Sequence, residues 1–385
     1  MLGLSRDRFS PAVKAKAVSA AATSKSFAQA QTQLETLGEI TMSDRHLGRL
    51  AHDAGQKLLG DQRERAELHG RKELPVEVEN LPELAVVETD GGRIRIRKEG
   101  QGPGTHDPAW RESKTALFQR MTSETHALDP CPELPDFLKN RKHIRQLVLE
   151  MSGSADGMEA SEDDDPRPEH AIRHEAPKRL MRTCLSSLDD SETFGTLMAA
   201  EAHRKGFYEA KRRAFVADGM KCNWTVWKRH FPTFTPIVDL LHVVSYLYHA
   251  ACAIAESEDF GWGLCVEWTR AVWQGRVLDV ITELGEWLDA QVPSAEPLAK
   301  TDPQAIVAST LTYLKNNASR MDYPRYRLEG LPLTSVLVES LIKEINYRVK
   351  GTEKFWNDPS GANSILALKA ASLSDDQRLD KLLSR

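Results

Sequence analysis

The chain has 385 residues, and its 51 basic and 56 acidic residues give a net charge of −5 with histidine neutral. At roughly 150 residues per domain, this length predicts two or three domains with room for a hydrophobic core. A hydrophobic content of 41% and a charged content of 28% exclude a disordered chain. The small net charge gives no general sign of a nucleic-acid partner.

No apolar run reaches the roughly 18 residues that a membrane span needs, because Asp239, His242 and His249 interrupt the most apolar stretch. The N-terminus carries charges where a signal peptide would have its apolar segment. The cysteines are odd in number and form no Cys-x-x-Cys pair, which indicates reduced thiols. We therefore expect a cytoplasmic protein that has no membrane partner.

Two helices separated by a short break are predicted near the N-terminus. Apolar residues recur at helical spacing over 27–37, Gly38 ends the first helix, and Ser43 begins the second. In a helix-turn-helix, the exposed residues at the start of the second helix enter the major groove of DNA. Those residues here are Arg45, His46 and Arg49. An ordinary helical hairpin explains the same pattern equally well.

The next segments have the period of β-strands. Residues 84–90 and 93–97 are predicted to form a hairpin with its turn at Gly91, which places Asp90 at the bend. Residues 110–121 are predicted to return as a third antiparallel strand, so that the three strands form a meander.

Alternating helices and strands are predicted in the middle of the chain. Residues 151–177 have the composition of an exposed loop, and helical spacing follows over 178–210. Strands are then predicted over 212–218 and 234–239, with a helix between them. Both of these strands end in an aspartate.

The remaining sequence is mainly helical in pattern. Residues 240–317 are predicted to be almost entirely helical, and a last long helix is predicted to begin near Pro332 and to end at Gly351. The polar segment 359–385 is expected to be a loosely attached tail.

Three acidic residues occupy informative places in this order of elements. Asp90 and Asp218 end predicted strands, and Glu339 lies on the last long helix. A mixed sheet can bring such residues to one edge, and oxygen ligands without Cys or His favour Mg²⁺ or Mn²⁺. Two such ions support phosphoryl transfer on nucleic acid. Taken singly, each acid is better explained as a helix cap or a turn residue.

Basic and polar residues near these acids are compatible with a DNA backbone. Helical geometry places Glu339 on one polar stripe with three further residues, namely Lys343, Asn346 and Lys350. A solvated outer face of the helix would look the same. Residues 203–230 are predominantly basic, so the small net charge conceals a positive zone close to Asp218.

Four blocks of sequence occur in an order that is known from one family. They read VVETDGGRI at 86–94, FVADG at 215–219, VDLLHV at 238–243 and GLPLTSVLVES at 330–340, and the last is followed by residues 346–356. In this order they resemble the bacterial insertion-sequence transposases of the DDE type, in particular the Kra group related to Mutator-like transposases. The resemblance covers roughly residues 84–356.

The resemblance implies an α/β fold with an RNase-H-like mixed-sheet core that an all-α insertion interrupts. The expected divisions are a helix-turn-helix-like DNA-binding segment, the first part of the catalytic core, the helical insertion, the final core helix and a tail. Their boundaries are 1–75, 84–240, 241–328, 329–358 and 359–385.

The resemblance also implies the roles of the site residues. Asp90, Asp218 and Glu339 become the catalytic, metal-binding triad with two Mg²⁺ (or Mn²⁺) ions. Asp239-x-x-His242 matches a signature of the Mutator-like class, in which His242 acts near the cut. A buried histidine bonded to the backbone is the alternative for His242, and Asp239 is expected to be an accessory residue that caps the helix beginning at Leu240.

The implied function is DNA transposition by metal-dependent strand cleavage and strand transfer. The implied partner is double-stranded DNA, both transposon ends and target, and the implied assembly is a homo-oligomer in the synaptic complex. Two other classes fit the same features: a transposase-derived DNA-binding regulator, and a metal-dependent nuclease that cleaves without joining.

Overall fold

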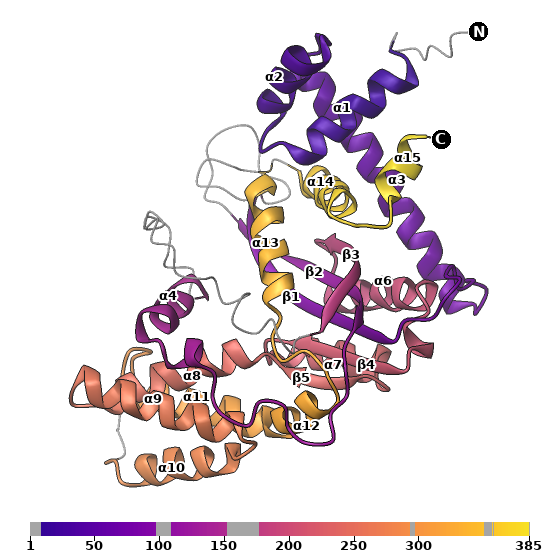
Figure 1. Cartoon of the computed structure of the whole chain (residues 1–385). Coiled ribbons are helices and arrows are strands. Elements are labelled where there is room, and N and C mark those ends of the chain that lie inside the picture. The colour runs from indigo at the N-terminus through magenta and orange to yellow at the C-terminus, as the bar shows by residue number, and fades with distance from the viewer. Residues whose placement is uncertain are drawn as a thin grey trace.

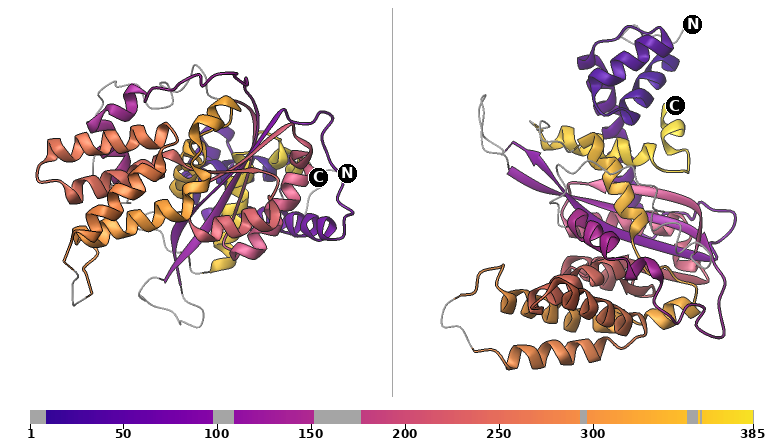
Figure 2. Two further views of the ribbon diagram at one scale, coloured as in Figure 1. Left: turned by 90° about the horizontal axis from the view of Figure 1, so that it is seen from below. Right: turned by 60° about the vertical axis from the view of Figure 1, so that its left-hand side comes forward.

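The computed structural model describes residues 9–97, 109–151, 177–292, 297–349, 356 and 358–384, without the side chains of 336–339, 346 and 347. An N-terminal helical bundle, a central sheet and a block of helices follow one another along the molecule (Figures 1 and 2). The sheet is mixed and five-stranded, which agrees with the α/β class expected from the sequence.

Three helices make up the N-terminal bundle: α1 (Pro11–Thr23), α2 (Phe27–Gly38) and α3 (Asp44–Gly70). Each begins at a serine whose hydroxyl accepts a backbone hydrogen bond from the third residue after it. The break between α2 and α3 lies at Gly38 and Ser43, where the sequence predicts it. The helix α1 was not predicted, and α3 extends further than the apolar pattern indicated.

The sheet has the strand order β3-β2-β1-β4-β5. The bounds of its strands are β1 (Leu84–Ile96), β2 (Ala109–Thr122), β3 (Lys178–Ser187), β4 (Arg212–Ala217) and β5 (Thr235–Val238). The first three strands are antiparallel, whereas β4 and β5 run parallel to β1. The helices α6 (Ser191–Arg204) and α7 (Lys221–His230) make the connections that parallel strands require.

Two of the predicted strand boundaries are wrong. The sequence Gly91-Gly92 does not form a turn, because both residues remain extended and pair with Lys114 and Ser113 of β2. Asp90 therefore lies inside one long strand, and the connection between β1 and β2 comes after Arg97. A long partner strand thus overrides the local turn preference of two glycines.

The helix predicted over 178–210 begins only at Ser191. Residues 178–187 instead form β3, which pairs with the outer edge of β2. The run from Thr183 to Ser187 is buried on both faces, so it lacks the alternation by which a half-exposed strand is recognised. The exposed loop expected over 151–177 lies almost entirely outside the described residues.

The block of helices follows β5. It comprises α8 (Leu240–Ile254), α9 (Glu258–Trp273), α10 (Val277–Asp289), α11 (Pro303–Asn317) and α12 (Tyr323–Leu328), and α4 (Arg141–Met151) packs on α8. Short 3₁₀ helices lie at Asp136–Lys139, Phe207–Glu209 and Ala318–Arg320. No helix in the described ranges has both the length and the apolarity that crossing a bilayer requires.

The two faces of the sheet belong to different hydrophobic cores. Phe118 and Ala116 face a core that includes α6, α7 and the block of helices. Ile94, Leu117 and Cys184 face a second core, formed with the N-terminal bundle and with α13 (Val336–Val349) and α14 (Pro359–Ser372). In Figure 1, α13 crosses this second face in front of β1 and β2.

The segment 359–385 is not the loosely attached tail that its composition suggested. Residues 362–371 of α14 are all buried between α3 and β3, and α15 (Arg378–Leu383) follows. An alanine-rich helix that is buried on every side has no amphipathic pattern, which explains the wrong expectation.

A buried cluster of ion pairs holds the C-terminal segment in place. Arg378 pairs with Glu201 and with Asp376 at 2.7 Å each, and Lys205 pairs with Asp376 at 2.7 Å. Burial alone would raise the pKa of Glu201, but Arg378, Arg204 and Lys205 outweigh it and lower the pKa to about 2. Because each charge has an opposite partner, the cluster tolerates removal from water.

The N-terminal bundle is also joined to α13. The guanidinium of Arg348 donates to the carbonyl oxygens of Ala21 and Lys25 at 3.3 Å each, at the end of α1. It also lies 4.4 Å from the centre of the Phe27 ring. Burial lowers the pKa of Arg348 to about 10, so the side chain still carries its charge at neutral pH.

The contact between α3 and α14 predicts opposite effects for two glycines of α3. A Cβ atom on Gly55 would lie 2.2 Å from the Ser364 carbonyl oxygen, whereas one on Gly60 would meet nothing within 4 Å. We expect Gly55→Ala to lower the free energy of unfolding by about 1–3 kcal/mol and Gly60→Ala to raise it by up to about 1 kcal/mol. Urea denaturation of both variants measures this, and equal effects would contradict the close packing of α14.

Candidate active site

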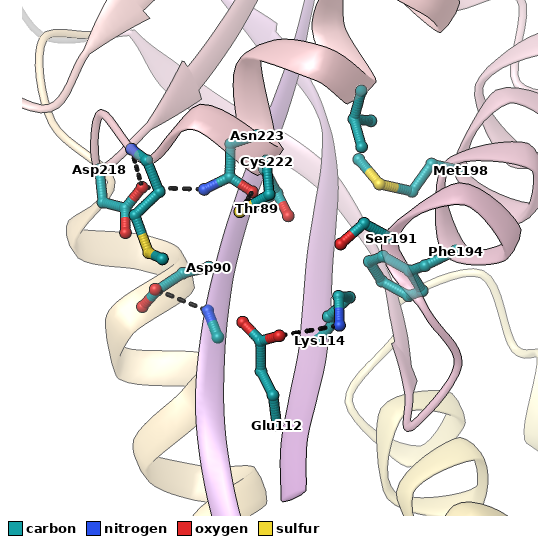
Figure 3. Close-up of a pocket in the computed structure, with 13 residues that line it drawn as sticks. Thr89, Asp90, Glu112, Lys114, Ser191, Phe194, Met198, Asp218, Cys222 and Asn223 are labelled. Carbon is teal, nitrogen blue, oxygen red and sulfur yellow. Dashed lines mark hydrogen bonds and ion pairs between the residues drawn. The ribbon is translucent and has the colours of Figure 1, made fainter.

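Two carboxylates meet where β4 ends beside β1. The parallel register places Thr89 opposite Ala217, so the next residues along the two strands are Asp90 and Asp218. Both line the pocket shown in Figure 3. The sequence predicts that these two acids come together, and the topology of the sheet brings this about.

Each carboxylate is fixed through one oxygen atom. Oδ1 of Asp218 accepts hydrogen bonds from the Met220 backbone N–H at 2.9 Å and from Nδ2 of Asn223 at 2.8 Å. Oδ1 of Asp90 accepts the backbone N–H of Gly91 at 2.6 Å. Within the described part of the chain, no hydrogen bond reaches Oδ2 of either residue, so each retains an oxygen that can bind a ligand.

The proximity of these acids changes their electrostatics. Burial and the negative charge of Asp218 raise the pKa of Asp90 from its ordinary value of 3.8 to about 6, although the Gly91 N–H and His242 act in the opposite direction. The site therefore concentrates negative charge in a region that water stabilises poorly. A divalent cation would relieve this repulsion, and carboxylate oxygens are the ligands that Mg²⁺ prefers.

The turn that follows Asp218 is held by α11. The Tyr313 hydroxyl donates to the Asp218 carbonyl oxygen at 3.0 Å, and Nδ2 of Asn317 donates to the Gly219 carbonyl oxygen at 3.4 Å. Gly219 has φ +94°, and a Cβ atom there would lie 2.6 Å from the Tyr313 ring. Only glycine suits this turn. Sequence reasoning missed this support, because Tyr313 and Asn317 belong to a distant helix with no motif of its own.

Asp239 is a buried structural residue at the start of α8. Its Oδ1 accepts the Leu241 backbone N–H at 2.7 Å, and its Oδ2 accepts both the backbone N–H, at 2.9 Å, and the hydroxyl of Ser335. It therefore caps α8, the position that the sequence suggests, and it also fixes the residue immediately before α13. Its side chain is fully buried, at 0% exposure.

His242 lies in the first turn of α8, three residues after Asp239. Its side chain is partly exposed, and its charge favours the ionised form of Asp90. Its Nδ1 atom is buried and has no hydrogen bond to the described residues. The alternative for His242, a buried histidine that is hydrogen-bonded to the backbone, is therefore not observed at Nδ1.

Glu339 belongs to the first turn of α13, one helical turn after Ser335. The helix packs against β1, the strand that contains Asp90. The side chains of Glu339 and Asn346, and residue Lys350, lie outside the described residues. Lys343 is exposed and pairs with Glu150 of α4 at 2.6 Å.

The pocket includes polar residues that sequence reasoning did not select. Glu112 and Lys114 of β2 form an ion pair of 2.9 Å, and Ser191 lies at the start of α6 (Figure 3). The cavity has a volume of about 20 Å³, which suits a water molecule or an ion. The sequence predicts the strand β2, but it does not predict the register that brings Glu112 beside Gly91.

The three predicted DNA-contacting residues of α3 lie apart from this pocket. None of the residues that line the pocket belongs to α1, α2 or α3. Arg45 and Arg49 are exposed, and Nη2 of Arg49 lies 2.9 Å from Nδ1 of His46. The His46 ring also contacts Phe9, with 5.1 Å between ring centres. The start of α3 is therefore accessible to a partner.

A complete metal centre is not visible in the described side chains. Among them, no group of three His, Cys, Asp or Glu residues is arranged to hold one ion. The Glu339 side chain does not enter this comparison, because it lies outside the described residues.

Comparisons with known proteins add little to this geometry. No protein-family model matches the chain, and no curated protein matches it. Among solved structures, the chain is similar to the Drosophila P element transposase strand transfer complex, with 10% sequence identity and a TM-score of 0.37 over 97% of this chain and 94% of that chain. Because this likeness establishes neither a family nor an activity, the function must be argued from the carboxylate site.

The raised pKa of Asp90 predicts that this residue destabilises the metal-free protein. As the pH rises from about 4 to 6, the unfolded chain releases this proton before the folded chain does, so the folded state loses stability. We expect Asp90→Asn to raise the free energy of unfolding by about 1–3 kcal/mol at pH 7.5 but not below about pH 4. Denaturation in EDTA at both pH values tests this, and a pH-independent difference would contradict it.

Proposed function

We propose that this protein is a DNA transposase of the DDE type, which cleaves DNA strands at the ends of an insertion sequence and joins them to a target. The observation that carries the proposal is the pairing of Asp90 with Asp218 at the end of β4. The two residues lie where the pairing of β1 with β4 ends, in a sheet whose first three strands are antiparallel and whose last two are parallel to β1. This is the arrangement expected of an RNase-H-like core.

The position of α13 supports the third member of the triad. Asp239 and Ser335 tie the start of this helix to the start of α8, and the helix packs on β1. In this proposal Glu339 completes the metal site with Asp90 and Asp218, and the helices within residues 241–328 are the insertion in the core. His242 is proposed to act beside the cut, with Asp239 positioning it.

The residues present suit two Mg²⁺ or Mn²⁺ ions. Asp90 and Asp218 each retain a carboxylate oxygen, and their mutual repulsion favours a bound cation. When bound, divalent ions activate a water molecule or a 3′-hydroxyl and neutralise the charge that develops on the phosphodiester.

Other residues of the chain hold the Asp218 carboxylate and its turn in a fixed geometry, which this chemistry needs. Asn223 and the Met220 N–H hold one oxygen of Asp218, which leaves the other directed to a ligand. Tyr313 fixes the backbone of the same turn. Such preorganisation lowers the cost of bringing the reacting groups into position.

The N-terminal bundle is proposed to recognise the element ends, through Arg45, His46 and Arg49. Double-stranded DNA is then the partner at both ends and target, within a synaptic homo-oligomer. Lys343 and, by sequence, Asn346 and Lys350 are proposed to contact DNA beside Glu339. For Lys343 this requires exchange of its ion pair with Glu150 for a phosphate, which is feasible because the pair is exposed.

Removal of any triad carboxylate tests the chemistry. We expect Asp90→Asn, Asp218→Asn and Glu339→Gln each to reduce Mg²⁺-dependent cleavage and strand transfer on the order of a thousand-fold, since an amide has no charge with which to hold the ion. Glu344→Gln, an exposed change on the same helix as Glu339, is the matched control.

A folded Glu339→Gln protein with full activity would remove that residue from the triad. Cleavage by the wild type without joining of pre-cut ends would identify a nuclease. DNA binding without any metal-dependent cleavage would favour the regulator.

Recognition by α3 is tested by a second pair of variants. We expect Arg45→Ala with Arg49→Ala to weaken binding to element ends more than binding to random DNA, because base contacts provide discrimination and phosphate contacts mainly provide affinity. Lys57→Ala with Arg63→Ala, exposed further along α3, is the control. Competition binding on both DNAs measures the ratio, and an unchanged ratio would show that this helix does not recognise the ends.

A further inference from the structure

The hairpin of β1 and β2 extends beyond the rest of the sheet. Pairing with β4 ends at Thr89, and pairing of β2 with β3 ends at Lys114, which lies opposite Gly91. From Gly92 onward, the two strands continue as a ribbon to Ile96 and Ala109, and the backbone of Trp356 pairs with Arg95 and Arg97 at the outer edge of β1. This ribbon begins directly beside Asp90.

The two faces of the ribbon have opposite character. Ile94 and Ile96 are buried and belong to the core that contains α13 and the N-terminal bundle. The intervening residues of β1 are Arg93 and Arg95, and Arg97 continues the same alternation. Strand geometry therefore places these arginines on the other face, at intervals of about 6.6–6.8 Å.

An exposed aromatic residue accompanies the arginines. Trp110 lies opposite Arg95 in the register of the two strands, and its side chain is 50% exposed. The Arg95 guanidinium lies 4.9 Å from the centre of the Trp110 ring. A tryptophan on a two-stranded ribbon presents much apolar surface to water, which is a feature of binding surfaces.

We propose that Arg93, Arg95, Arg97 and Trp110, called the arginine stripe, form a DNA-binding surface that receives the strand leaving the carboxylate pocket. The proposal rests on the proposed function, because it takes the pocket of Asp90 and Asp218 as the place where the strand is cut.

The chemistry of the arginine stripe matches a nucleic-acid strand. Evenly spaced guanidinium groups suit a row of phosphates, because each can make two parallel hydrogen bonds to phosphate oxygens. An aromatic ring beside them provides a face on which an unpaired base can stack. Binding through charge and stacking needs no particular base sequence, which suits a strand that passes through the cutting site.

The arginine stripe is continuous with the pocket. Gly91, Glu112 and Lys114 lie on the same face of the hairpin and line the pocket. Arg93 follows Asp90 by three residues, about 10 Å along an extended strand, and this odd spacing places the Asp90 side chain on the opposite face, with Ile94 and Ile96. Glu112 lies opposite Arg93 but is ion-paired with Lys114 at 2.9 Å, so its charge is already engaged.

The test measures how binding depends on salt. The probe is a labelled DNA duplex of random sequence with a 3′ single-stranded extension, and the full chain is titrated in EDTA at several salt concentrations. We expect the combined change Arg93→Gln, Arg95→Gln and Arg97→Gln to lower the slope of log affinity against log salt by about 2–3, because each phosphate contact accounts for about 0.9. Trp110→Ala is expected to weaken binding to the extension roughly five-fold or more and to leave duplex binding unchanged.

Two controls separate the arginine stripe from general charge. Lys57→Gln, Lys300→Gln and Lys315→Gln together remove the same charge from exposed sites elsewhere, and this combination should keep the wild-type slope. Arg→Lys changes at the three stripe positions should keep most of the slope. If the triple glutamine variant fails to fold in a thermal melt, Arg93→Gln alone, at an exposed position, should lower the slope by about one.

The outcomes distinguish this proposal from the proposed function. If the triple variant folds and keeps the wild-type slope, the arginine stripe is overturned, whether or not the protein cuts DNA. If the triple variant does not fold, the same result for Arg93→Gln alone overturns it. A stripe-dependent slope in a protein that never cuts with Mg²⁺ would overturn the transposase assignment but retain the DNA-binding surface. Loss of slope in the scattered-lysine control would also overturn the stripe, because binding would then follow net charge alone.

Discussion

The buried carboxylate of Asp239 joins two segments that are far apart in the chain. It caps α8 through Leu241 and binds the backbone and hydroxyl of Ser335, so the helices between these residues begin and end at one point beside the sheet. Together with the hydrogen bond from the Leu240 N–H to the Leu333 carbonyl oxygen, this link fixes the start of α13 next to β1. A carboxylate removed from water is stable here because backbone and hydroxyl donors surround it. The geometry of the proposed metal site therefore depends on a residue that is not itself assigned to bind the metal.

The site is assembled from elements with different structural roles. The sheet supplies Asp90 and Asp218, α11 holds the turn after Asp218 through Tyr313, and α13 contains Glu339. At its other end, α13 places Arg348 at the end of α1. One helix thus contacts both the sheet that holds the two aspartates and the bundle proposed to bind DNA. A displacement of the bundle would therefore be transmitted through α13 to the sheet, and the reverse.

The sequence contained enough information for the parts of the fold that depend on local patterns. Ser43 marked the start of α3, and the runs ending at Asp218 and Asp239 marked β4 and β5. It failed where a distant partner decided the structure: the pairing with β2 keeps Gly91 extended, and burial on both faces hid β3. The sequence predicts that Asp90 and Asp218 come together, because both end strand-like runs. It does not predict that Tyr313 and Asn223 hold the turn and the carboxylate of Asp218. Such contacts depend on the register and packing of whole elements, which no short motif encodes.

The burial of α14 has a consequence for synthesis of the protein on the ribosome. Gly55 of α3 packs directly on Ser364, which is 309 residues later in the chain. At a translation rate of about 5–20 residues per second, α14 is synthesised roughly 15–60 s after the early helices whose core it completes. During that interval the apolar residues of α3 are open to chaperones or to other nascent chains. A nascent chain that stops short of α14 leaves this core incomplete and is exposed to proteolysis, so the early helices depend on a segment that is synthesised much later.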